Sequence, residues 1–349
     1  MTPASVDVSV ISVFHNRRAY VVDSVRSLLT QDCPGLEILL VDDGSTDGTA
    51  EWLGGIADDR VRFIGQPGIG FVRSLIGAVA ASRGRRIAIH GAGDISLPGR
   101  LRRQAEALDQ DAGLGVVGCY LKNVDPLSGR EWLRVPDARH SFREAVIREN
   151  PFCHGEVMFT RAAYEQAGGY RPFFQYAQDR DLWLRMSRFA RHGIVPEVLY
   201  QRVTVPGSIS KTPLTAALQA CYSAFALDCD RAVTDGDGDL LDRYGAAAPF
   251  FRRPSAALGR KLVDLASLAA LDGAASDARA CLALARREGA GVAASLCALA
   301  LADPVPEAFR RAVLHGLRQG LAGAPLDRLR RMVRRRAVMA APRHPEASS

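Results

Sequence analysis

Residues 36–49 read Leu36-Glu37-Ile38-Leu39-Leu40-Val41-Asp42-Asp43-Gly44-Ser45-Thr46-Asp47-Gly48-Thr49. The first six residues are mostly apolar and predict a buried strand, which an acidic pair follows directly. Open α/β sheets bind their ligands at the carboxyl ends of the strands. Asp42 and Asp43 therefore lie where a ligand site is expected. Because one fold can serve many functions, the function must be inferred from the residues of this site.

Strands and helices alternate on both sides of this stretch. An apolar run over 6–13 predicts the preceding strand, and an apolar stripe at helical spacing predicts a helix over 20–31. Downstream, further strands are predicted over 61–64, 86–90 and 116–121. This rhythm is typical of an α/β fold with a largely parallel sheet that helices cover on both faces.

The pattern changes in the second half of the chain. Residues 132–200 mix helical and strand-like segments, and after Thr212 the composition shifts to Ala, Leu and Arg. Helices in hairpins are predicted over 213–228, 255–271, 274–287, 290–302 and 306–321. We therefore predict an α/β domain over 1–212, a connection over 213–240, and a helical C-terminal region with a basic tail over 241–349.

The composition is that of a globular protein in a reducing compartment. The 349 residues are 48% hydrophobic and carry a modest formal charge of +7. Seven cysteines form no Cys-x-x-Cys pair, which favours free thiols over a disulfide framework or a zinc site. The first residues lack the pattern of a signal peptide, and no apolar run reaches the roughly 20 residues that span a bilayer. We expect a cytoplasmic protein, either soluble or peripheral on the inner face of the membrane.

Four segments, in this order and spacing, resemble the family 2 glycosyltransferases, which are inverting enzymes with the GT-A fold. They are Val10-Ile11-Ser12-Val13-Phe14-His15-Asn16-Arg17, the stretch 41–49, Asn150-Pro151-Phe152-Cys153-His154-Gly155 with Gly168-Gly169-Tyr170-Arg171, and Gln178-Asp179-Arg180-Asp181-Leu182-Trp183-Leu184-Arg185. The resemblance covers residues 6–211 and implies a Rossmann-like, mixed and mainly parallel sheet. It also implies transfer of a hexose or N-acetylhexosamine from a nucleotide-diphosphate donor, with UDP-sugars expected, to a glycan or lipid-linked acceptor.

The same resemblance implies which residues bind the donor nucleotide: Phe14, Asn16, Asp42, Asp43, Arg73 and Asp94. Asp43, with Asp42, suits the base or ribose because carboxylates accept hydrogen bonds from an imide N–H or a sugar hydroxyl. Arg73 suits the diphosphate because a helix N-terminus and a guanidinium both favour phosphate. The alternative is a surface turn with capping acids, followed by an arginine that is simply exposed.

Asp179 is the candidate general base by resemblance, since an inverting transfer needs a carboxylate beside the acceptor hydroxyl. The family usually has Glu-Asp here, whereas this chain has Gln178-Asp179. Asp181 is expected to cap the helix that carries Trp183. His154 and Trp183 are expected to line the acceptor pocket, with a structural histidine and a core tryptophan as the alternatives.

The chain departs from the family in the turn Gly91-Ala92-Gly93-Asp94. The family usually reads Asp-Ala-Asp-Asp there, and the last two acids commonly serve a divalent metal, for which glycine offers no side-chain ligand. Thr204 also stands where many relatives have a histidine. The metal site implied by the family is therefore weakened at two positions.

Three hypotheses about this departure stay open. In the first, Arg73, Arg202 and Lys211 meet the charge of the leaving diphosphate without a metal. In the second, Asp94 still holds Mg²⁺ or Mn²⁺ together with substrate phosphates and waters. In the third, the protein binds a nucleotide-sugar or a glycan and does not catalyse transfer.

A basic segment over 325–336 carries six arginines, with apolar residues on one side of a predicted helix. Such a segment is attracted to an anionic membrane surface by about 1 kcal/mol per basic residue. A solvated basic tail is the alternative. Nucleic-acid binding is not expected because the segment lacks interleaved aromatic residues.

Overall fold

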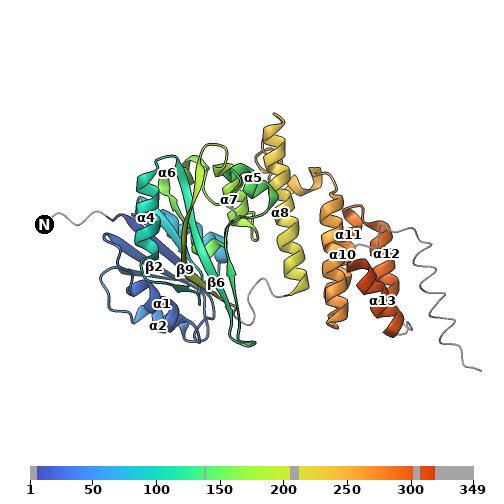
Figure 1. Ribbon diagram of the computed structural model, residues 1–349, viewed down its shortest axis with the longest axis horizontal. Coiled ribbons are helices and arrows are strands. Elements are labelled where there is room, and N and C mark those ends of the chain that lie inside the picture. Colours follow the sequence, from blue (N-terminus) through green and yellow to red (C-terminus); the bar gives the residue numbers. More distant parts are fainter. Residues whose placement is uncertain (1–5, 137–138, 205–211, 302–306, 319–349) are drawn as a thin grey trace, which may run out of the picture. The chain divides into compact units, whose positions relative to one another are not determined.

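A computed structural model describes residues 6–136, 139–204, 212–301 and 307–318 (Figure 1). The chain divides into two compact units, one grouping residues 1–208 with 225–250 and the other grouping 209–224 with 251–349. Residues 225–250, which fall across the predicted connection, thus group with the first unit. The predicted domain limits themselves remain a prediction.

The first unit is built on one mixed sheet. Its strands run in the order β3 (Val61–Gln66), β2 (Leu36–Asp43), β1 (Val8–Phe14), β4 (Arg86–His90), β8 (Met158–Thr160), β6 (Leu114–Asp125), β9 (Arg191–Val203) and β5 (Ile95–Ser96), and β7 (Arg130–Arg134) pairs with β6. The four strands from β3 to β4 are parallel, β8 is antiparallel to both of its neighbours, and β6 and β9 are parallel to each other. The predicted α/β fold with a helical C-terminal region is confirmed.

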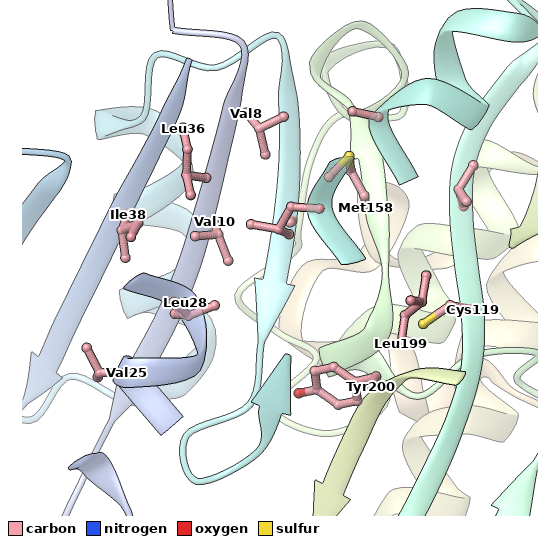
Figure 2. Packing of buried hydrophobic residues seen from close by; sticks show 14 of the residues in the cluster. Val8, Val10, Val25, Leu28, Leu36, Ile38, Cys119, Met158, Leu199 and Tyr200 are labelled. Atoms are coloured by element: carbon pink, nitrogen blue, oxygen red, sulfur yellow. The ribbon is translucent and has the colours of Figure 1, made fainter. Parts of the chain in front are cut away.

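Helices follow the strands closely in the chain. They are α1 (Val21–Leu29), α2 (Thr49–Gly54), α3 (Phe71–Ala81), α4 (Arg100–Gln110), α5 (Phe142–Arg148), α6 (Arg161–Gln166) and α7 (Gln178–Met186), with the 3₁₀ turn η1 (His154–Glu156) before β8. Figure 2 shows part of the core in which Val10 of β1 meets Val25 and Leu28 of α1. The alternate residues of the parallel strands, such as Ile11 and Leu39, are equally buried, so both faces of these strands are covered.

The second half of the chain is helical. It contains α8 (Pro213–Thr234), α9 (Leu240–Tyr244), η2 (Gly245–Phe251), α10 (Ala256–Leu271), α11 (Ala275–Arg287), α12 (Gly291–Ala300) and α13 (Glu307–Arg318). Small and apolar side chains such as Leu262, Ala285 and Leu314 form the core of the second unit. All seven cysteines are free thiols. Within the described ranges no helix combines the length and apolar character that a membrane crossing requires. The basic segment 325–336 lies outside the described residues.

Glu37 gives the parallel sheet a stability that depends on pH. Its carboxylate is buried on β2 and accepts hydrogen bonds from Ser9 Oγ at 2.6 Å, Arg83 N at 2.9 Å and Arg62 Nη1 at 2.9 Å. Burial alone would raise the pKa of Glu37, but the hydrogen bonds from Ser9, Arg83 and Arg62 outweigh it and lower the pKa to about 2. The stabilisation is therefore complete above the ordinary pKa of 4.5 and is lost as the pH falls towards 2.

We expect Glu37→Gln to lose about 2 kcal/mol of stability at neutral pH, and to flatten the loss of stability below pH 4.5. Denaturant unfolding at pH 7 and at pH values between 4.5 and 2 measures both effects. Glu131→Gln is the matched control, because Glu131 is half-exposed and pairs with Lys122 at the surface. An acid profile of Glu37→Gln parallel to that of the wild type would contradict this role.

Candidate functional site

Asp43, at the end of β2, holds the loop that leads into α3. Its Oδ1 accepts hydrogen bonds from Ile69 N at 2.9 Å and Gln66 Nε2 at 3.1 Å, and its Oδ2 accepts one from Gly70 N at 2.9 Å. Burial would raise the pKa of Asp43, but these hydrogen bonds lower it overall. Asp43 is therefore a charged group at the carboxyl edge of the sheet, with much of its hydrogen-bonding capacity directed at its own loop.

Asp42, the preceding residue, is buried and organises the turn that follows the strand. Its Oδ2 accepts hydrogen bonds from Gly44 N at 3.1 Å and Ser45 N at 2.9 Å. Its Oδ1 is buried and has no partner within the described part of the chain. An orphaned buried acceptor is costly in a folded protein and needs an explanation, and Asp42 Oδ1 retains the capacity to accept a hydrogen bond.

The end of β1 lies against this turn through Asn16. The backbone of Asn16 adopts a φ of 50°, its N–H donates to Ser45 Oγ at 2.9 Å, and its Oδ1 accepts from Thr46 N at 2.8 Å. Phe14, expected in the nucleotide site, is instead a core residue whose side chain has no exposed surface. The side chain packs in the same cluster as Val8 and Val10, and the assignment of Phe14 to the nucleotide stays a prediction.

The first turn of α3 joins the two halves of the site. Arg73, the third residue of this helix, is exposed. The ring of Phe71, the first residue, meets the ring of His154 edge-on at 6.0 Å between centroids. The strand ends that carry Asp42 and Asp43 are thereby linked, through α3, to the turn η1.

His154 connects η1 to the start of α7. Its Nε2 lies 2.7 Å from Tyr170 Oη and its Nδ1 lies 3.2 Å from Gln178 Nε2. An amide nitrogen only donates, so Nδ1 accepts and Nε2 carries the proton. Burial lowers the pKa of His154, although the nearby Asp179 acts in the opposite direction. His154 is thus a neutral, well-held imidazole, and Gln178 is its partner.

Asp179 lies in the first turn of α7 and is largely buried. Its Oδ2 accepts a hydrogen bond from Asn150 Nδ2 at 2.6 Å, and its Oδ1 accepts one from Arg180 N at 2.8 Å. Each carboxylate oxygen has two lone pairs, so both can accept a further hydrogen bond. The site thus brings Asp179 close to His154, as the two motifs require if they serve one reaction.

Two expectations on α7 are corrected. The helix begins at Gln178, after Ala177 with a φ of 54°, so Asp181 lies inside the helix and does not cap it. The Asp181 carboxylate is buried and pairs with Arg171 and Arg185. Trp183 is fully buried among aromatic side chains, so it is a core residue and offers no surface to an acceptor.

Asp94 closes the turn in which the family's metal ligands are expected. Its Oδ2 accepts a hydrogen bond from Tyr200 Oη at 2.6 Å, and its Oδ1 accepts one from Val203 N at 2.9 Å. Burial raises the pKa of Asp94 to about 6, against the lowering effect of those hydrogen bonds and of Arg202. Arg202 is exposed on β9, close enough to act on this carboxylate. Lys211 lies outside the described residues.

The donor set at this turn does not fit a divalent cation. Gly91 and Gly93 offer no side-chain oxygen, and the one carboxylate of the turn is directed at β9. Glu156, a second buried carboxyl that lies in η1, accepts a hydrogen bond from Cys153 N at 3.2 Å, and burial raises its pKa to about 8, which makes it a neutral acid at physiological pH. Across the described ranges, no three His, Cys, Asp or Glu side chains come together in a group that could hold a metal ion.

Three residues of the site were not anticipated from the sequence: Asn150, Tyr170 and Tyr200. Asn150 and Tyr170 lie inside segments that carry the family resemblance, so a polar residue there was a usable signal. Tyr200 had a subtler signal, which is the pair of glycines at 91 and 155 that leaves space for its hydroxyl.

The sequence model of a protein family described as "Glycosyl transferase family 2" matches residues 9–166. The chain is 30% identical over 201 residues to the putative glycosyltransferase EpsE of Bacillus subtilis (strain 168), a match that covers 56% of this chain and 72% of EpsE. Among solved structures, it is similar to the mannosyltransferase PcManGT from Pyrobaculum calidifontis, in complex with GDP-Man and Mn²⁺. That likeness has a TM-score of 0.50 and 21% identity, and it covers 89% of this chain and 85% of PcManGT.

A second solved structure is S. aureus TarS 1–349 in complex with UDP, with a TM-score of 0.50, 16% identity, and coverage of 90% of this chain and 92% of TarS. At these identities the two structural likenesses concern the fold alone. They confirm the GT-A fold that the sequence predicts, with a mixed sheet flanked by helices.

Proposed function

Because this chain belongs to glycosyltransferase family 2, we propose that it transfers a sugar, with inversion, from a nucleotide-diphosphate donor to a hydroxyl of a glycan or lipid-linked acceptor. The observation that carries the proposal is the link from Asp43 through the start of α3 and His154 to Asp179. This series of contacts supports a single site that contains both the proposed donor-binding residues and the proposed base. UDP and GDP are the first nucleotides to test, since TarS and PcManGT are in complex with UDP and GDP-Man.

The carboxyl edge of β1 and β2 supports the donor half of the proposal. Asp42 Oδ1 is a buried acceptor without a partner in the described part of the chain, and a base N–H or a ribose hydroxyl would satisfy it. Asp43 fixes the loop before α3, so the N-terminus of that helix and Arg73 are held beside the same edge. We assign the base or ribose to Asp42 and Asp43, and the diphosphate to Arg73.

Asp179 supports the catalytic half of the proposal, in which it is the general base. The acceptor hydroxyl oxygen attacks the anomeric carbon while its proton passes to the Asp179 carboxylate. The bond from the anomeric carbon to the phosphate oxygen breaks, and the nucleoside diphosphate leaves with that electron pair. Attack from the face opposite the leaving group gives inversion. Asn150 holds one oxygen of the Asp179 carboxylate in place. His154, whose two ring nitrogens contact Tyr170 and Gln178, is assigned to the wall of the acceptor pocket.

A protein of this fold that binds nucleotide-sugars or glycans without catalysis is the second candidate. The glycine at position 93 favours it, because it replaces one of the two acids that commonly hold the metal in the family. The two candidates differ in the fate of the donor: the enzyme releases the nucleoside diphosphate, whereas the binding protein holds the donor intact.

We expect Arg73→Ala to weaken binding of UDP or GDP by about tenfold, because one charge-assisted contact to the diphosphate is lost. The matching nucleoside, uridine or guanosine, is expected to bind as before. Calorimetric titration of all four compounds measures this difference. Arg26→Ala serves as the control, since Arg26 is exposed on α1 and pairs with Asp23. Equal losses for nucleotide and nucleoside would place Arg73 away from the diphosphate.

A further inference from the structure

Tyr200, near the end of β9, contacts the turn that follows β4. Its side chain is fully buried, the guanidinium of Arg100 lies 4.6 Å from its ring centroid, and the ring of His90 meets it edge-on. Figure 2 shows its hydroxyl directed towards the loop that follows β4. A buried tyrosine hydroxyl needs partners, and this one finds them in residues 91–94.

The Tyr200 hydroxyl bonds to both ends of this turn. It accepts a hydrogen bond from Gly91 N at 2.9 Å and donates one to Asp94 Oδ2 at 2.6 Å. The other oxygen of Asp94 accepts from Val203 N at 2.9 Å. The carboxylate is therefore engaged through both oxygens by β9, and it anchors the turn to that strand.

Two glycines make room for this arrangement. A Cβ at Gly91 would collide with the Asp94 carboxylate, and a Cβ at Gly155 would collide with the Tyr200 hydroxyl. The φ of Gly91 is outside the range that favours glycine, so its small size, and not its backbone, explains the residue there. Gly91 thus leaves room for the Asp94 carboxylate, and Gly155 leaves room for the Tyr200 hydroxyl that binds it.

We propose that this latch, formed by the Tyr200 hydroxyl, Gly91 N–H and the Asp94 carboxylate, commits Asp94 to β9 and keeps it from serving as a metal ligand, so that the site binds its donor without a divalent cation. The inference rests on the proposed function, since it concerns the donor of that reaction. Arg202 lies two residues after Tyr200 on β9, close enough to interact electrostatically with Asp94, and Arg73 lies at the start of α3. These two guanidinium groups would supply the positive charge that the diphosphate requires.

The first test is calorimetric titration of the full chain with UDP and GDP in the presence of Mn²⁺, of Mg²⁺ and of excess chelator. The latch predicts affinities that agree within about threefold across the three conditions. Binding that is about tenfold or more tighter with a metal overturns the inference. For the Asp94→Asn variant, the latch predicts the same change in nucleotide affinity with chelator as with Mn²⁺. If Asp94 were a metal ligand, the variant would lose nucleotide affinity only in the presence of Mn²⁺.

If neither nucleotide binds in any condition, the proposed donor is wrong. The latch is then tested by the binding of Mn²⁺ to the chain without nucleotide. Electron paramagnetic resonance of free Mn²⁺ then measures its uptake by the full chain. No site that depends on Asp94 is expected. A stoichiometric site that Asp94→Asn removes would overturn the inference, and a site that survives this change lies elsewhere and is consistent with it.

A double-mutant cycle tests the hydrogen bond itself. Asp94→Asn and Tyr200→Phe disturb the same contact, so their losses in unfolding free energy are expected to be non-additive. Tyr120→Phe, on β6, is the control, and its effect should add to that of Asp94→Asn. Additive losses for Asp94 and Tyr200 would show that the two side chains act separately and would overturn the latch.

Discussion

Asp179→Asn is expected to lower turnover of the donor by about 10²–10⁴-fold, the usual contribution of a general base. The amide cannot take the proton of the acceptor hydroxyl at neutral pH. It has the shape of the carboxylate and keeps one oxygen that can accept from Asn150 Nδ2, while the hydrogen bond from Arg180 N is lost. The rest of α7 is expected to form as in the wild type. Donor affinity is expected to change by less than about threefold, because the nucleotide is assigned to the edge of β1 and β2.

The measurement is release of the nucleoside diphosphate from the donor that the wild-type protein turns over, together with calorimetric binding of that nucleotide. Asp111→Asn is the control, since it makes the same chemical change on a residue that pairs with Arg191 at the surface. Unchanged turnover would exclude Asp179 as the base. A loss of donor affinity as large as the loss of rate would make Asp179 a donor-binding residue, and a wild-type chain that binds donor without turnover would favour the binding protein.

The fold could be predicted because its signals are local. The strand over 86–90 was predicted with the bounds it has, and β2 extends only two residues beyond the apolar run, through Asp42 and Asp43. Two short strands that depend on pairing with another strand were missed. β7 is an exposed strand whose order comes from its pairing with β6, and β5 has two residues that pair with β9. Neither carries an apolar pattern of its own.

The sequence predicted which residues belong to the candidate site, but it did not predict the contacts that these residues make. Family motifs pointed to Asp43, His154 and Asp179, and the structure brings these segments together, but the roles of the three residues remain proposals. Contacts between residues far apart in the chain could not be read from local sequence. The bond between Asp94 and Tyr200 spans 106 positions, and the pairing of Asp181 with Arg171 depends on how α7 lies against the preceding loop.

Asp181→Asn is expected to destabilise the first unit by about 3–5 kcal/mol, the range for removing one partner of a buried ion pair. The Asp181 carboxylate accepts hydrogen bonds from Arg185 Nη2 at 2.7 Å and from Arg171 Nε at 3.1 Å. Arg171 also pairs with Asp239 at 2.9 Å, which ties α7 to the segment before α9. An asparagine removes the negative charge that faces two largely buried guanidinium groups. The resulting loss of stability exceeds that of one lost hydrogen bond.

Tryptophan fluorescence during denaturant unfolding measures the loss of stability of the first unit, because Trp52, Trp132 and Trp183 all belong to it. Asp23→Asn is the matched control: Asp23 pairs with Arg26 on the surface of α1, and an exposed pair contributes little. If Asp181→Asn unfolds like the wild type but loses turnover, then Asp181 serves the reaction and not the fold. The opposite results expected for Asp179 and Asp181, two residues apart on one helix, therefore separate catalysis from stability at this end of the site.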